Sequence, residues 1–190
     1  KRYQIQPVWR GERPQDGRFR EFIQADIDVV AEDSLADHFE VEVPLVMAQA
    51  FDALRELGVP PVRILANNRK LLEGFARGLG LDDIPEVLRS LDKYDKIGPE
   101  RVGELLASEC GASAAQQQAL LKLAAIEADT SSFADEVLAL GVTDPLLDEG
   151  LESLVRLIDA AHLIQPGVVV AQLKIARGLD YYTGSVYETQ

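Results

Sequence analysis

Residues 1–30 have the sequence KRYQIQPVWR GERPQDGRFR EFIQADIDVV, and this stretch decides the fold. Hydrophobic and polar side chains alternate over residues 3–10 and again over 20–30, which is the period of a β-strand. The segment 11–18 between them is rich in glycine, proline and aspartate, and it predicts a hairpin loop longer than a two-residue turn. We therefore expect two antiparallel strands with one apolar face in the core.

The opposite face of the predicted hairpin is polar. If the apolar faces of the two strands coincide, Arg10, Gln24 and Asp28 lie together on the other face. A face that only needs to be hydrated usually tolerates Lys, Thr and Ser, whereas this face combines glutamine and aspartate with arginine. The composition therefore favours a polar ligand.

Arginine is concentrated in this stretch, although the chain as a whole is acidic, with a net charge of −13. The first twenty residues have two acidic side chains but six basic ones, namely Lys1, Arg2, Arg10, Arg13, Arg18 and Arg20. A planar guanidinium group matches a phosphate or carboxylate with two hydrogen bonds. The loop therefore predicts an anion site. The alternative is a solvated loop in which the arginines pair with Glu12, Asp16 and Glu21.

Residues 9–22, WRGERPQDGRFREF, resemble the second signature motif of class II aminoacyl-tRNA synthetases. The form ERPQDGR running on to FIQ is similar to the histidine-specific members. The resemblance implies ATP as a substrate with Mg²⁺. It assigns the ATP α-phosphate to Arg10, the adenine side to Glu12, the β- and γ-phosphates to Arg18, adenine stacking to Phe22, and the histidine pocket to Gln24. We also expect Asp28 in the histidine pocket, where it could assist Mg²⁺. Within the same loop, we expect Arg13 and Gln15 to contact tRNA.

A second unusual stretch, RGLDYYTGSVYE, covers residues 177–188. Its rings and hydroxyls would form a slot for a small planar polar side chain, and a hairpin with surface tyrosines is the alternative. The stretch resembles the histidine-recognition signature of histidyl-tRNA synthetases. This implies that Arg177 faces the amino-acid carboxylate and the α-phosphate, that Tyr182 contacts the imidazole, and that Tyr181 packs nearby. A regular strand over 168–176 would point Arg177 into the core, whereas a break at Gly178 would reorient it.

The rest of the chain predicts an α+β fold: a class II synthetase-like antiparallel sheet flanked by helices, with an all-helical insertion domain. We expect 1–67 and 145–190 to be parts of the catalytic core and 68–144 to be the insertion. An acidic connection over 31–42 precedes a helix that begins at Pro44, and a strand follows over 62–66. Residues 69–140 contain helical runs and no convincing strand.

One segment of the predicted insertion, LDKYDKIG at 91–98, has alternating charges. Charge pairs at the surface of a helix end explain it, and we expect no chemistry from it. It is nevertheless similar to a stretch in the histidyl enzymes.

Composition limits the classes of protein to which the chain can belong. The single cysteine, Cys110, excludes an internal disulfide framework and favours the cytoplasm, and no apolar run is long enough to predict a membrane span. His38 and His162 have no second ligand at metal spacing, so we expect no protein-bound metal. Both ends look cut, and the first and third motifs and the anticodon-binding domain of the resembled family have no counterpart, so we expect a fragment that is inert alone.

The resemblance as a whole implies a histidine–tRNA ligase activity, with histidine, ATP and the cognate tRNA as partners and a homodimer in the full-length protein. The alternative is the regulatory paralogue of histidine biosynthesis, which binds an ATP phosphoribosyltransferase instead of tRNA. A paralogue that does not activate histidine would not need Arg10, Glu12 and Arg18 together with an intact RGLDYY stretch. A free-standing helical interaction module would leave the loop arginines unexplained.

Overall fold

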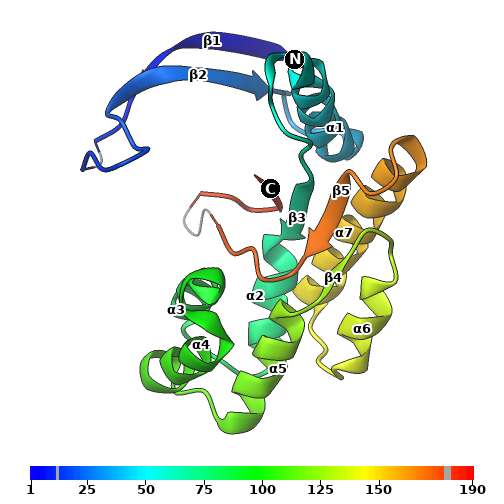
Figure 1. The fold of residues 1–190 in the computed structure, drawn as a ribbon. Coiled ribbons are helices and arrows are strands. Elements are labelled where there is room, and N and C mark those ends of the chain that lie inside the picture. The colour runs from blue at the N-terminus through cyan, green and yellow to red at the C-terminus, as the bar shows by residue number, and fades with distance from the viewer. Residues whose placement is uncertain (12, 178–180) are drawn as a thin grey trace. The chain divides into compact units, whose positions relative to one another are not determined.

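A computed structural model of the chain describes residues 1–11, 13–177 and 181–190 (Figure 1). The predicted adenine-side residue Glu12 and the segment 178–180 lie outside the described residues. The chain forms two compact units, residues 1–39 and residues 40–190. Each unit has its own sheet. The insertion boundaries at 68 and 144 stay a prediction.

The first unit is dominated by an antiparallel hairpin. Strand β1 (Arg2–Trp9) pairs with β2 (Glu21–Asp28) over its whole length. The backbone N–H of Arg10 extends the ladder by donating to the carbonyl of Arg20 at 2.8 Å, and a bridge between residues 15 and 18 closes the loop. The predicted antiparallel pair and its long loop are therefore confirmed.

The apolar face of this hairpin is exposed, so the prediction that it forms core is wrong for this structure. Register places Tyr3 opposite Ile27 and Ile5 opposite Ala25, as the alternation requires. Yet Ile5 is 67% exposed and Trp9 is 71% exposed. Alternation sorts side chains onto faces, but a two-stranded ribbon buries a face only where another layer packs on it.

Helix α1 (His38–Ala53) begins six residues before Pro44, where the sequence analysis expected it to start. Pro44 lies inside the helix and has no N–H to donate to the carbonyl of Glu40. The hydroxyl of Tyr187 donates to that carbonyl instead, at 2.7 Å. A bond from elsewhere in the unit therefore replaces the missing helical one, which is why the proline does not mark the helix start.

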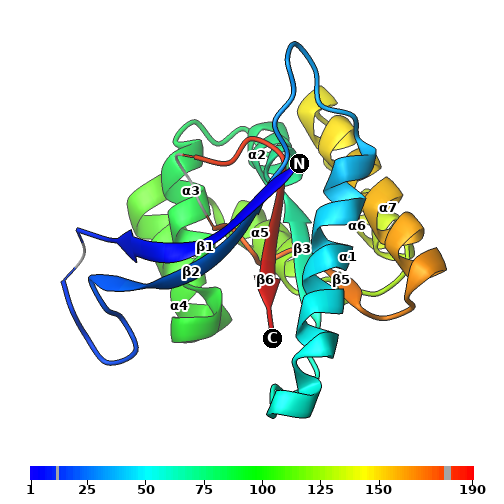
Figure 2. The ribbon, with the colours of Figure 1, turned by 90° about the horizontal axis from the view of Figure 1, so that it is seen from above.

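The second unit contains a mixed sheet with the strand order β4-β5-β3-β6. Its strands are β3 (Ile64–Asn68), β4 (Glu127–Ala128), β5 (Val169–Gln172) and β6 (Ser185–Thr189). Strand β3 pairs antiparallel with β6 and parallel with β5, and Figure 2 shows β6 beside β3. All described side chains of β3 and β5 are buried. The α+β class is confirmed, and the parallel pair makes this sheet mixed.

Strand β4 corrects the expectation that residues 69–140 contain no strand. It has only two residues, which pair antiparallel with Gln172 and Ala171 of β5. Two residues are too few for an alternation pattern, so only the partner strand reveals it. The strand predicted over 62–66 is displaced to 64–68. The strand predicted over 168–176 is shortened to 169–172, because the chain leaves β5 at Gln172.

The helices of the second unit follow the predicted order with small changes at their ends. They are the 3₁₀ turn Arg55–Leu57, α2 (Arg69–Gly78), α3 (Ile84–Leu91), α4 (Tyr94–Cys110), α5 (Ala114–Ala124), α6 (Phe133–Ala139) and α7 (Pro145–Ile164). Side chains cap several of them: Asn68 begins α2, Asp83 begins α3, and Ser113 with Gln116 forms a capping box on α5. Helix α4 is kinked at Gly98.

Helices α2 and α7 approach each other closely because each has a glycine at the contact (Figure 1). A Cβ atom on Gly74 would lie 2.1 Å from the backbone nitrogen of Leu147. A Cβ atom on Gly150 would lie 2.2 Å from the backbone nitrogen of Leu71. The buried leucines of these helices belong to one hydrophobic cluster that also includes residues of β3, β5 and α3 to α6.

Candidate active site

The hairpin brings three of the predicted site residues together. Arg10 follows β1, and Phe22 and Gln24 alternate with apolar residues along β2. The Nη2 group of Arg10 donates to Oε1 of Gln24 at 3.1 Å, and the guanidinium carbon lies 4.9 Å from the centre of the Phe22 ring. A hydrogen bond and a cation–π contact therefore set the position of the guanidinium group.

The polar face continues along β2, and it includes a residue that the sequence analysis did not select. The amide Nε2 of Gln24 donates to Oδ1 of Asp26 at 2.6 Å. Asp26 therefore orients Gln24, which in turn orients Arg10. The signal was present, because Asp26 has the same parity as Gln24. Asp28 instead pairs with Nε of Arg2 at 3.0 Å.

The loop residues predicted to contact ATP and tRNA are exposed. The backbones of Gln15 and Arg18 are joined by two hydrogen bonds, from Gln15 N to Arg18 O at 3.2 Å and from Arg18 N to Gln15 O at 2.8 Å. Arg13, Gln15 and Arg18 are all exposed. Their roles stay predictions.

Arg177 belongs to the second unit, where β5 ends earlier than the sequence pattern indicates. The buried side chain of Asn67 donates from Nδ2 to the carbonyls of Leu173 at 3.1 Å and Ile175 at 2.9 Å. These bonds take carbonyls that a continuing strand would have offered to a neighbouring strand. The chain therefore leaves the sheet before Arg177, whose side chain is 46% exposed rather than pointing into the core.

Two carboxylates hold Arg177. Its Nε forms a short ion pair with Glu188 of β6 and lies 3.3 Å from Oδ1 of Asp92, in the turn between α3 and α4. Partial burial by itself would lower the pKa of Arg177, but its hydrogen bond to the Glu188 carboxylate and the charges of Asp92, Glu188 and Asp95 outweigh burial and raise the pKa. The cation is therefore firmly charged and anchored from two elements.

The first turn of α4 makes a second long-range ion pair. Oδ1 of Asp95 lies 2.7 Å from Nζ of Lys174, three residues before Arg177. The charge pairs expected for residues 91–98 are therefore present, but their partners are distant in sequence. The acidic side chains of Asp92 and Asp95 reach the segment that follows β5. Sequence spacing did not reveal this, because the partners lie about eighty positions further along the chain.

Arg69 is a further cation next to Arg177 that sequence reasoning missed. Both residues line a cavity of about 10 Å³, together with side chains of α3, β6 and the segment after β5. Nη1 of Arg69 is buried and has no hydrogen-bond partner in the part of the chain that the structure describes. The backbone N–H of Arg69 donates to the carbonyl of Gly184 at 2.9 Å, which ties the start of α2 to the start of β6.

The predicted tyrosines, Tyr181 and Tyr182, follow residues 178–180 in sequence, and those three residues lie outside the described part of the chain. Tyr181 is 84% exposed and Tyr182 is 47% exposed. Their rings pack edge to face with centres 5.3 Å apart. The predicted histidine slot between them stays a prediction.

A polar cluster centred on Glu40 anchors the strand that follows these tyrosines. Its Oε2 accepts hydrogen bonds from the hydroxyls of Ser185 at 3.0 Å and Ser153 at 3.1 Å. Its carbonyl accepts the Tyr187 bond described above. Burial, and then the charge of Glu40, raise the pKa of the Tyr187 hydroxyl, so the tyrosine stays protonated as a donor. The proline within α1 was the available signal for this cluster.

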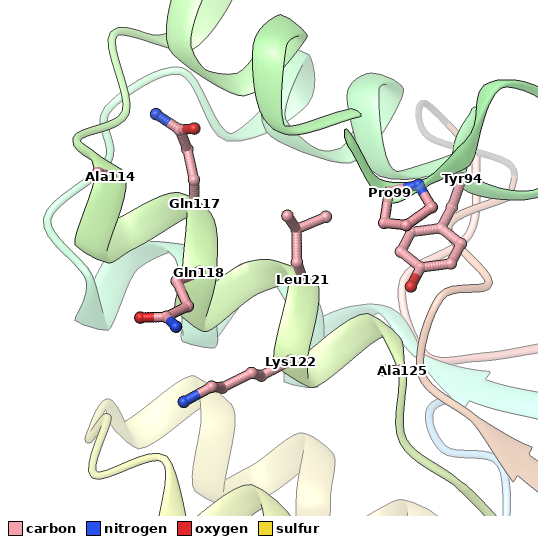
Figure 3. Close-up of a pocket in the computed structure, with 8 residues that line it drawn as sticks. All are labelled: Tyr94, Pro99, Ala114, Gln117, Gln118, Leu121, Lys122 and Ala125. Carbon is pink, nitrogen blue, oxygen red and sulfur yellow. The ribbon is translucent and has the colours of Figure 1, made fainter. Parts of the chain in front are cut away.

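An open groove of about 620 Å³ lies between α4 and α5 (Figure 3). Its lining residues are Tyr94, Pro99, Ala114, Gln117, Gln118, Leu121, Lys122 and Ala125. The amide of Gln117 donates to the carbonyl of Ala112 at 2.7 Å and is therefore committed to the fold. None of the predicted site residues lines this groove.

The described residues contain no group of three or more His, Cys, Asp or Glu side chains placed to hold a metal ion. Among the described helices, none is both long enough and apolar enough to span a bilayer. His162 has its Nδ1 3.0 Å from the carbonyl of Asp129, and the ring of His38 stacks on Phe39.

Two solved structures share the fold of this chain. A crystal structure of histidyl-tRNA synthetase from Nostoc sp. PCC 7120 superposes on the whole chain with a TM-score of 0.86 at 31% identity, and the match covers 43% of that protein. An ATP phosphoribosyltransferase regulatory subunit/histidyl-tRNA synthetase from Bacillus halodurans C has a TM-score of 0.73 at 16% identity, over 98% of this chain and 46% of that one. At that identity, the second likeness shows the fold alone. The fold is that of part of an aminoacyl-tRNA synthetase.

Sequence comparison gives the family. The sequence profile of histidyl-tRNA synthetase matches residues 3–189, so the chain belongs to the histidyl-tRNA synthetase family. It is 56% identical to a histidine–tRNA ligase of Bifidobacterium animalis subsp. lactis over 199 aligned positions, and 55% identical to one of Cutibacterium acnes over 191. All of this chain is aligned in both cases. The chain spans 43% and 42% of the length of these two relatives.

Proposed function

We propose that this chain is part of the catalytic core of a histidine–tRNA ligase. Such an enzyme activates histidine with ATP and then transfers the histidyl group to the 3′ end of its tRNA. The main support is the alignment of the whole chain, including both arginine-bearing signatures, with histidine–tRNA ligases at 55–56% identity. The geometry agrees, because each signature presents one arginine whose position is set by neighbouring side chains.

In the proposed reaction, a carboxylate oxygen of histidine attacks the α-phosphorus of ATP in line. The bond from the α-phosphorus to the bridging oxygen breaks, pyrophosphate leaves, and histidyl-adenylate remains. No bond to the protein forms, so catalysis depends on positioning and on charge neutralisation. Arg10 and Arg177 supply the cations. Arg10 binds the α-phosphate already in the ground state, whereas Arg177 acts mainly as charge grows during attack.

The remaining residues of the hairpin would position ATP. Phe22 stacks on adenine, Glu12 lies on the adenine side, and Arg18 binds the β- and γ-phosphates. In the structure, Arg10 lies over the Phe22 ring, so adenine stacking on that face requires the guanidinium to move toward the phosphates. The hydrogen bond from Arg10 to Gln24 fixes the position from which the guanidinium group would move.

The histidine side chain would be recognised by Gln24, Tyr181 and Tyr182, with Arg177 at its carboxylate. Asp28 is also assigned to this pocket, although its carboxylate is paired with Arg2. A ligand that uses Asp28 must therefore compete with an exposed ion pair, which is a weak competitor.

Magnesium would enter with ATP, bound to its phosphate oxygens. The carboxylates nearest to Arg10 do not form a protein cage, because Asp26 is bonded to Gln24 and Asp28 to Arg2. The described residues therefore do not fit a resident metal site, and no step is assigned to one.

The wider partners follow from the same proposal. Arg13 and Gln15 are exposed in the loop and would contact tRNA. The acidic net charge of −13 makes non-specific RNA binding weak, so these contacts should be local. We further propose that the full-length protein is a cytoplasmic homodimer. We also propose that the helical insertion over 68–144 is a domain that moves against the core.

A regulatory paralogue remains the second candidate, favoured only by the fold likeness at 16% identity. Histidine-dependent exchange of pyrophosphate into ATP by the full-length protein separates the two. The ligase proposal expects exchange that requires both histidine and Mg²⁺. A folded protein that binds histidine without exchange would contradict it and favour the paralogue.

A further inference from the structure

The turn between α3 and α4 is anchored to the hydrophobic core of the second unit. Asp92 caps the C-terminus of α3, where its backbone N–H donates to the carbonyl of Leu88 at 2.9 Å. Leu88 and Leu91 are each 1% exposed. The carboxylate of Asp92 therefore projects from a backbone that packing already holds in place.

Asp92 in this turn and Asp95 in the first turn of α4 both pair across the unit rather than with their neighbours in sequence. The stretch from Asp92 to Lys96 offers adjacent lysines, which would suffice for a solvated helix end. Instead Asp92 lies beside Arg177, and Asp95 lies beside Lys174. Because the spacing is three residues on each side, two neighbouring ion pairs join the junction of α3 and α4 to one short segment in antiparallel order.

The segment 173–177 is held from several elements. Asn67 fixes the carbonyls of Leu173 and Ile175. The pair with Glu188 fixes Arg177 to β6, and the pair with Asp92 fixes it to the helical part of the unit. Because both carboxylates approach Arg177 most closely at Nε, they restrain the base of the guanidinium group.

We propose that Asp92 is a positioning residue for Arg177, and that the Asp95–Lys174 pair supports it by fixing the turn against the segment after β5. A long side chain loses rotamer freedom when it grips a ligand, and an anchor that holds it beforehand reduces that loss. The helical segment 84–110 then takes part in histidine activation through this turn. The inference rests on the proposed ligase function.

The test uses the full-length protein with Asp92→Asn, which removes the charge but keeps the size. Because a small misplacement of a catalytic group is costly, we expect the rate constant of histidine activation to fall about tenfold or more. The Michaelis constants for histidine and ATP should change much less. Glu152→Gln is the matched control, since Glu152 pairs with Arg156 on the exposed face of α7, and its kinetics should equal those of the wild type.

Two further sets of variants separate positioning from folding. In an Arg177→Ala background, Asp92→Asn should change the activation rate no further, whereas additive losses would overturn the proposal. Asp95→Lys and Lys174→Asp should each slow activation, and the double variant should recover most of it. Failure of the charge reversal to recover, in variants whose melting temperatures match the wild type, would also overturn the proposal.

The outcome also distinguishes this inference from the function on which it rests. Absence of exchange in the folded wild type would contradict the ligase function itself. Normal wild-type exchange, with Asp92→Asn as active as Glu152→Gln, would contradict the positioning role alone.

Discussion

The two arginine sites differ in how far along the chain their supports lie. Arg10 is held by Phe22 and Gln24 across one hairpin, within fifteen residues. Arg177 is held by Glu188 and by Asp92, which lies eighty-five positions earlier. The first site is therefore a local construction, and the second requires the whole second unit to be folded.

This difference has an energetic consequence. The supports of Arg10 are solvent-accessible contacts, and such contacts are individually weak. The supports of Arg177 depend on buried groups such as Asn67, which is 0% exposed. Damage to the core of the second unit should therefore disable Arg177 while leaving the hairpin intact.

The largest expected effect comes from Asn67→Ala. It leaves the carbonyls of Leu173 and Ile175 without their side-chain donor, at about 1–3 kcal/mol for each buried group. We expect a lower free energy of unfolding in urea and much slower histidine activation. The fluorescence of Trp9, the single tryptophan, reports on the hairpin of the first unit and should keep its native value in this variant.

Gly74→Ala should be next in size. The added methyl group meets the backbone of Leu147, so α2 and α7 must separate, at about 1–3 kcal/mol. Gly103→Ala on α4 is the matched control, because its nearest neighbour is a flexible leucine methyl group at 3.5 Å. The control should be neutral or slightly stabilising, since alanine favours helices. Equal unfolding curves for both variants would contradict the close contact.

Tyr187→Phe should cost about 1 kcal/mol, because the Glu40 carbonyl beside Pro44 loses its donor. The substitution should also change how the folding stability declines at alkaline pH. The pKa of Tyr187 is raised above its usual 10 by burial, so its contribution to stability is complete below pH 10 and is lost as the pH rises further. Denaturation followed from pH 9 upward should show a shallower decline in the variant. An unchanged decline would mean that Tyr187 does not govern it.

The smallest effect on stability should come from Gln24→Ala in the hairpin. Its bond to Arg10 is exposed, and the expected change in unfolding free energy is within about 0.5 kcal/mol. Gln6→Ala, directly opposite on β1, is the control. Histidine activation should still fall in Gln24→Ala and not in Gln6→Ala. A stability loss as large as that of Asn67→Ala would remove the contrast between the two regions.

The same contrast explains what the sequence could predict. Strand alternation correctly placed Arg10, Phe22 and Gln24 on one face, because register follows from local pattern. It could not show that Ile5 and Trp9 stay exposed, since burial depends on a second layer.

Non-local contacts were beyond the sequence analysis for the same reason. Nothing near Asp92 indicates Arg177 as its partner, and nothing near Tyr187 indicates the free carbonyl of Glu40. The end of β5 was also misplaced, because the buried amide of Asn67, from another strand, takes its carbonyls. Such features become visible only once the chain is folded.

The central claim is that Arg10 and Arg177 act at different stages of one reaction. Single-turnover measurement of histidyl-adenylate formation by the full-length Arg177→Ala variant tests it most directly, with Arg10→Ala beside it. We predict that Arg177→Ala slows activation by on the order of 3 kcal/mol, or about a hundredfold, with ATP binding nearly unchanged. Arg10→Ala should weaken ATP binding and slow the reaction together. A raised Michaelis constant for histidine with an unchanged turnover rate in Arg177→Ala would contradict the account.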